Sequence, residues 1–102
     1  MTLQQDFEQA ALDVRKLTQK PSPKDLLKLY ALYKVGTGAD ISQAKAPGMF
    51  EIQAKAMRRE WQDLVDTEIT QEDAQKAYID KVKELKETHG FDLNKEPEAV
   101  RS

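Results

Sequence analysis

Three tyrosines and one lysine are the residues whose types and spacing suggest a ligand site. In the stretch LYALYKVGTGAD (residues 29–40), Tyr33 follows Tyr30 by three residues and Lys34 follows it by four. On a helix, these spacings place the three side chains on one side. Together with Tyr78 they would offer rings for stacking, phenol hydroxyls and an ammonium group, which suits an aromatic, phosphorylated ligand such as a nucleotide. Core tyrosines beside a lysine whose stem lies along apolar surface would leave the same pattern.

Other kinds of site find little support in the sequence. His89, the single histidine, falls at the expected end of the last helix, where it would complement the helix C-terminus rather than transfer protons. The chain has no cysteine, which excludes disulfides, thiolate metal sites and cysteine nucleophiles. The GTG of residues 36–38 lacks the preceding strand and the Gly-Lys-Ser/Thr of a phosphate-binding loop. We therefore expect no catalytic residue, no metal site and no cofactor.

Length and charge narrow the class of protein. The 102 residues suit one small domain, and the 16 basic and 18 acidic residues leave a net charge of −2. This balance argues against a dedicated nucleic-acid-binding protein, which would carry a basic excess. The start MTLQQDFEQA does not resemble a signal peptide, and no apolar run approaches the roughly 20 residues of a membrane span. The expectation is a cytoplasmic protein without a nucleic-acid partner and without stable membrane insertion.

Four amphipathic segments must position the candidate residues. Apolar residues recur at helical spacing, with no credible strand, over about residues 3–18, 23–35, 52–65 and 70–89. Thr2, Ser22 and Thr70 are typical N-caps, Thr2 forms a capping-box pattern with Gln5, and Gly90 is a natural stop. The sequence therefore predicts an all-α fold.

Two features of this all-α pattern point to a ligand. The second segment is apolar on too wide a surface for one core contact, which suggests that one face packs in the core and the other meets something else. The segment is followed by a loop over residues 36–51 with three glycines and Pro47. Connections of this length in small domains are usually functional or disordered.

The sequence resembles the acyl-CoA-binding protein family over nearly its whole length up to Gly90. Four stretches carry the resemblance: FEQAALDVRKLTQKPS, LLKLYALYKVGTGAD, APGMFEIQAKAMRREW and TQEDAQKAYIDKVKEL, at residues 7–22, 26–40, 46–61 and 70–85. Specific to the family are the order and spacing of a YxxYK helix, a Pro-Gly loop, a tryptophan and AYIDKV. The tryptophan, Trp61, matches a core position of the family.

The resemblance implies a four-helix up-down-down-up bundle with a shallow bowl on one side. The adenosine 3′-phosphate end of the ligand would lie at the rim and the fatty acyl chain in an apolar groove. By this carry-over, Tyr30 and Lys34 contact the phosphorylated head, Tyr33 helps hold the adenine and Tyr78 closes the site. The other positions carried over are two basic residues near the ligand and two leucines that touch the acyl chain: Arg15, Lys20, Leu26 and Leu27.

The implied function is a non-enzymatic, monomeric carrier of fatty acid metabolism that binds and sequesters long-chain acyl-CoA. Residues 1–90 would form the acyl-CoA-binding domain, and residues 91–102 a partly mobile extension in which Phe91 and Leu93 are candidates to dock. The alternative is a helical interaction module that has kept the fold and lost strong acyl-CoA binding.

The third helix departs from the family pattern. Met57 replaces the family's phosphate-binding lysine, Arg58 the first of two tryptophans and Gln53 a lysine. The loop before Pro47 is one residue longer than is typical, and the turn at residues 65–70 is two residues longer. A methionine neither carries charge nor donates a hydrogen bond. Our hypothesis is that Arg58 partly compensates, reaching the same phosphate obliquely through its long stem.

Overall fold

The computed structural model describes residues 2–92. Within them lie four α-helices and two short 3-10 helices: α1 (Leu3–Asp13), η1 (Val14–Lys16), α2 (Pro23–Gly36), η2 (Ile41–Gln43), α3 (Ile52–Asp66) and α4 (Gln71–His89). The expected all-α class and the four main helices are confirmed. Leu93 and the rest of the predicted extension lie outside the described residues.

Local capping sets most helix boundaries where the sequence predicts them. The Thr2 hydroxyl accepts from the Gln5 amide at 3.1 Å, and the Gln5 side chain accepts from the Thr2 amide at 3.0 Å, which completes the capping box. The Ser22 and Thr70 hydroxyls accept from the backbone amides of Asp25 and Asp73 and so cap α2 and α4, without the reciprocal bond of a capping box. Gly90 takes a φ of 75°, the left-handed region that glycine enters without a Cβ clash.

The first helix ends earlier than predicted. The expected segment over residues 3–18 is helical only to Asp13, and the 3-10 turn η1 follows. Leu17 is extended, with φ −65° and ψ 138°, and its backbone forms an antiparallel β-bridge with Phe91. The α-helix stops because the following residues pair with the chain that leaves α4. Phe91 docks as anticipated.

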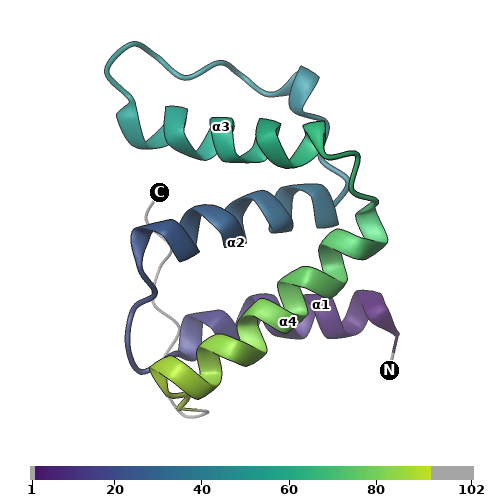
Figure 1. Cartoon of the computed structure of the whole chain (residues 1–102), viewed down its shortest axis with the longest axis vertical. Helices are drawn as coiled ribbons and strands as arrows, with labels where there is room; N and C mark the ends of the chain where they lie inside the picture. Colours follow the sequence, from purple (N-terminus) through teal and green to yellow (C-terminus); the bar gives the residue numbers. More distant parts are fainter. Residues whose placement is uncertain (1, 93–102) are drawn as a thin grey trace.

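Figure 1 shows the direction of each helix. From α1 to α2 the chain reverses, α3 runs the same way as α2, and α4 runs back, which confirms the up-down-down-up topology. Helix α2 packs against both α3 and α4, and α1 packs mainly on α4. The connection over residues 37–51 returns along the length of α3, as it must for two consecutive helices to be parallel (Figure 1). Ile41 of η2 is buried and anchors it.

The core is built around aromatic rings. Phe7 is 2% exposed, stacks on Tyr33 with ring centroids 5.6 Å apart, and meets the edge of Tyr78 at 5.2 Å. Trp61 is 4% exposed and meets Tyr30 edge-on at 6.3 Å, which confirms its predicted burial. The other buried apolar residues are Ala10, Leu17, Leu29, Ala31, Leu32, Ile41, Leu64, Ala74, Val82 and Leu85.

Polar contacts join three helices at the C-terminus of α2. The buried Gln75 side chain donates to the Gly36 carbonyl at 2.8 Å and to the Gln4 side chain at 2.9 Å. Gln71 donates to the same carbonyl at 3.1 Å. A carbonyl in the last turn of a helix has no partner within that helix, so these amides supply it. These three hydrogen bonds join α1, α2 and α4.

Two ion pairs link helices at the other end of the bundle. The Lys86 ammonium lies 2.6 Å from the buried Asp13 carboxylate and 4.5 Å from the centroid of the Phe91 ring. Lys81 of α4 lies 2.9 Å from Asp25 in the first turn of α2, and its hydrogen bond lowers the pKa of the Asp25 carboxyl. Together with the Gln71 and Gln75 side chains at its start, these ion pairs hold both ends of α4 against α1 and α2.

Substitution of Gly36 tests the close approach of α2 to α1. A Cβ at this position would lie 2.7 Å from Cζ of Phe7, whose buried ring is held between Tyr33 and Tyr78. We expect Gly36→Ala to lower the free energy of unfolding by about 1–3 kcal/mol, because overpacking outweighs the gain of about 1 kcal/mol in helix propensity. Urea denaturation measures the change.

Gly48→Ala is the matched control. Its added Cβ would meet nothing nearer than the Glu51 carboxylate at 3.6 Å, an ordinary contact. We expect a change within about 0.5 kcal/mol. Equal effects of the two substitutions would contradict the packing argument.

Candidate ligand site

The first group of candidate residues joins α2 to α3. The Lys34 ammonium lies 5.7 Å from the centroid of the Tyr30 ring and 5.5 Å from that of Trp61. A cation at these distances is attracted by the negative faces of both rings. Within residues 2–92 no carboxylate pairs with Lys34. Lys34 is half-buried, and its ammonium forms no hydrogen bond or ion pair with any residue in this range.

Trp61 completes this group, although the sequence indicated only a core role for it. Its Nε1 is buried and, within the described chain, has no hydrogen-bond partner. An unpaired buried donor of this kind costs about 1–3 kcal/mol. The indole thus serves the group with its π surface, beneath a lysine from the neighbouring helix. The contact depends on the register between α2 and α3, for which the sequence offers no signal.

A second group joins α2 to α1 and α4. Tyr33 is 41% exposed, and its ring centroid lies 5.9 Å from that of Tyr78. Tyr78 is buried, and this burial, with a smaller contribution from Tyr33, raises the pKa of its phenol to about 12. The positive charge of Arg15 acts in the opposite direction. The structure places Tyr78 beneath Tyr33 in the core, so that only Tyr33 presents its ring at the surface.

The apolar candidates lie on the same helix as Tyr30 and Lys34. Leu26 is 37% exposed and Leu27 is half-buried, both near the start of α2. At 1.5 Å per residue, Leu26 and Lys34 are about 12 Å apart along the axis. Helix α2 therefore carries an apolar end and a cationic, aromatic end. Outside α2, two basic candidates are exposed: Arg15 in η1, and Lys20 in the segment between η1 and α2.

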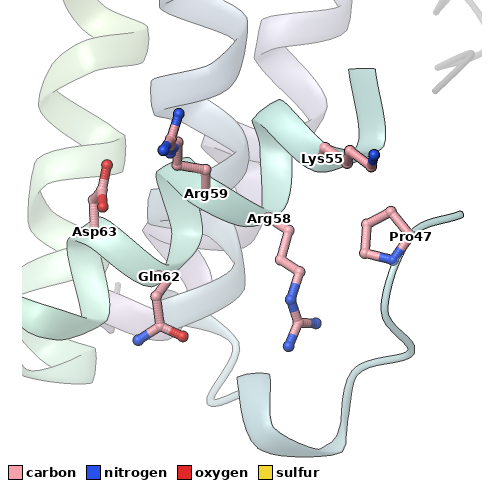
Figure 2. A pocket seen from close by; sticks show the side chains of 6 residues that line it. All are labelled: Pro47, Lys55, Arg58, Arg59, Gln62 and Asp63. Carbon is pink, nitrogen blue, oxygen red and sulfur yellow. The ribbon is translucent and has the colours of Figure 1, made fainter. Parts of the chain in front are cut away.

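The structure places Met57 and Arg58 in different depressions of the surface. Met57 is half-buried in a depression of about 490 Å³ lined also by Phe50, Glu51, Ile52, Gln53 and Ala54. Arg58 points to the preceding loop and donates to the Ala44 carbonyl at 3.3 Å (Figure 2). Its depression, of about 330 Å³, is lined also by Pro47, Lys55, Arg59, Gln62 and Asp63. That Arg58 takes the role of the missing lysine at the ligand phosphate stays a prediction. It requires the guanidinium to leave the Ala44 carbonyl.

Two other kinds of feature are not found in the described part of the chain. Among residues 2–92, no three His, Asp or Glu side chains are grouped so that they would hold a metal ion. In the same range, no helix is both long and apolar enough to cross a bilayer.

Comparisons with known proteins agree with the geometry. The model of the family described as "Acyl CoA binding protein" matches residues 4–82. The chain is 45% identical over 85 residues to an acyl-CoA-binding protein homolog of Manduca sexta, a match that covers 83% of this chain and 92% of that protein. It is 43% identical over 90 residues to acyl-CoA-binding protein homolog 1 of Caenorhabditis elegans, covering 88% and 99%. The crystal structure of Oryza sativa acyl-CoA-binding protein 2 superposes with a TM-score of 0.74 at 32% identity, covering 85% and 93%.

The buried phenol of Tyr78 predicts a specific loss of stability at high pH. Its pKa is about 12 in the folded protein and about 10 in an unfolded chain. The stabilisation is therefore complete below pH 10 and is lost as the pH rises toward 12, by about 2–3 kcal/mol in total. Urea unfolding of wild type and Tyr78→Phe at increasing pH measures it, with phenolate absorbance to follow the titration. If both proteins lose stability equally between about pH 10 and 12, the phenol is not protected by burial.

Proposed function

Because the chain belongs to the acyl-CoA-binding protein family, we propose that it binds and sequesters long-chain fatty acyl-CoA thioesters. It acts as a carrier and pool former and does not transform its ligand. The observation that carries the proposal is α2, which presents Lys34 over Tyr30 and Trp61 at one end and Leu26 with Leu27 at the other. Acyl-CoA has matching parts: a phosphorylated, aromatic head and an apolar tail.

The head group is assigned to the end of α2 that carries the lysine. Lys34 supplies a charge-assisted hydrogen bond to phosphate, with Tyr30 beside it. Tyr33 presents a partly exposed ring for the adenine, and Tyr78 supports Tyr33 from below. Arg15 and Lys20 add positive charge at the surface. The acyl chain then extends along Leu26 and Leu27 toward the start of α2.

The absence of catalysis is part of the proposal. The family is one of binding proteins. His89 contacts the Thr88 hydroxyl at 2.6 Å at the end of α4, while the aromatic groups that define the site come from α1, α2, α3 and the middle of α4. Binding alone shields the thioester from hydrolysis. We further propose that the ligand-binding unit is residues 1–90, that it is a monomer, and that it works in the cytoplasm in fatty acid metabolism.

Calorimetric titration with palmitoyl-CoA tests the role of Lys34. We expect Lys34→Ala to weaken binding by about 1.5–3 kcal/mol, the range for hydrogen bonds to charged groups. Lys28→Ala, at an exposed position on the same helix, is the control and should bind like wild type. Equal affinity of Lys34→Ala and wild type would refute the assignment. A wild-type protein that binds no acyl-CoA of any chain length would instead be an interaction module.

Substitutions on α3 test the missing lysine. We expect Met57→Lys to tighten binding by about 1–2 kcal/mol, because it restores a charge-assisted hydrogen bond to phosphate. Arg58→Ala should weaken binding in the wild-type background and matter less beside Met57→Lys, because the two cations would share one anion. If Arg58→Ala has no effect in either background, the arginine stays with the Ala44 carbonyl and compensates for nothing.

A further inference from the structure

The last residue of α4 and the three residues that follow it pair with the chain between α1 and α2. We call residues 89–92 the strap, and they run antiparallel to residues 16–19 around the bridge between Leu17 and Phe91. Three backbone hydrogen bonds of 3.0 Å join the two segments: from Asp92 to Lys16, from Thr18 to Gly90 and from Gln19 to His89. The other backbone hydrogen bonds outside the helices of residues 2–92 are local. The strap is therefore the long-range backbone contact of the described chain.

Side chains hold the strap in register. Leu17, at the centre of the pairing, is 3% exposed. A Cβ on Gly90 would collide with the Thr18 hydroxyl, and the φ of 75° at Gly90 also favours glycine. The two segments therefore approach each other as closely as a residue without a side chain allows.

The strap also reaches the end of α1, through Lys86. The half-buried Phe91 ring has its centroid 4.5 Å from the Lys86 ammonium, which lies 2.6 Å from the Asp13 carboxylate. Asp13 is the last residue of α1 and directly precedes η1. Figure 1 shows the end of α4 beside η1. Both ends of residues 13–19 are thus held by one part of the molecule, the last turns of α4 and the strap.

The paired segment is flanked by the two basic candidates that lie outside α2. Arg15 comes one residue before it and Lys20 one residue after it, and both are exposed. Within residues 2–92 neither forms an ion pair. Burial raises the pKa of the Tyr78 phenol and the charge of Arg15 opposes that rise, which places Arg15 near the group of Tyr33 and Tyr78. The backbone pairing, rather than a carboxylate, sets where these two cations stand.

We propose that the strap positions Arg15 and Lys20 for the phosphate groups of the ligand head. The inference rests on the proposed function, because it concerns the site of that same ligand. Between η1 and α2 the chain is not helical. Without the strap this chain must be ordered when the ligand binds, which lowers the affinity. The ligand-binding unit, proposed above as residues 1–90, then extends to Asp92, and Phe91 and Asp92 act on the ligand only through the segment they hold.

Two substitutions of Asp92 in the full chain isolate one hydrogen bond of the strap. Asp92→Pro removes the N–H that donates to the Lys16 carbonyl, and a proline there suits the extended residue before it. Asp92→Ala is the matched control, because it removes the same carboxylate and keeps the N–H. In calorimetric titration with palmitoyl-CoA, we expect Asp92→Pro to bind at least about fivefold more weakly than Asp92→Ala. Phe91→Ala should weaken binding similarly, and if both Asp92→Pro and Phe91→Ala bind like Asp92→Ala, the proposal is overturned.

The same comparison without the two cations separates positioning from a general effect on the fold. In a protein that carries Arg15→Gln and Lys20→Gln, the strap has no charge left to place, so Asp92→Pro should change the affinity by less than about twofold. With both cations present, the loss caused by Asp92→Pro should shrink as salt is added, because salt screens the contact with phosphate. An equal loss with and without the cations would mean that the strap only stabilises the fold, which would overturn the proposal.

Hydrogen exchange without ligand tests the pairing itself. The amides of Thr18 and Gln19 donate to the strap, so they should exchange slowly in wild type and at least about tenfold faster in Asp92→Pro. Exchange of these amides at equal rates in the two proteins would overturn the strap. A wild-type protein that shows the slow exchange but binds no palmitoyl-CoA would overturn the carrier function, and the positioning role with it. A wild-type protein that binds palmitoyl-CoA no better than Asp92→Pro and Phe91→Ala do would overturn the positioning role alone.

Discussion

The packing of α2 against two partners is the constraint on which the rest of the structure depends. Helix α2 contacts α3 on one side and α4 on the other, so its apolar surface must be wide, and Leu29, Ala31 and Leu32 are buried between them. Tyr30 and Tyr33 are close in sequence but turn to different neighbours, Tyr30 to Trp61 on α3 and Tyr33 to Phe7 and Tyr78. One short helix therefore brings both aromatic groups to the same part of the molecule.

The sequence predicts those helix ends that local chemistry determines. The capping residues at Thr2, Ser22 and Thr70 act within three residues of themselves, so short patterns suffice to find them. The end of α1 was predicted wrongly because it depends on Leu17 pairing with Phe91, at the far end of the described chain. Helical spacing places an apolar residue on a face without saying what covers that face. Ile52, the first residue of α3, is 78% exposed.

The residue types of the candidate site follow from the sequence, but their contacts do not. Tyr30 and Lys34 share a helix, and the spacing of four residues predicts their proximity. That Trp61 lies under the same ammonium depends on the register of two parallel helices, which the long loop between them sets. Met57 and Arg58 are adjacent in sequence and point about 100° apart on α3. The Ala44 carbonyl fixes the arginine on the loop side, a contact for which no sequence pattern exists.

Helix α3 differs from the other long helices in how it begins, and this difference bears on its roles. The helices α1, α2 and α4 start at residues whose side chains accept a backbone hydrogen bond, whereas Glu51 at the start of α3 forms no such bond. The N-terminus of α3 therefore lacks about 1 kcal/mol of capping stabilisation that the others have. Its buried residues are Trp61 and Leu64, in its later turns, so its first turn contributes little to the core. Exposed apolar residues at this position disturb the bundle least, because the helices that hold the core do not depend on them. Helix α3 is thus held in the bundle through its later turns, where Trp61 lies beneath the Lys34 ammonium.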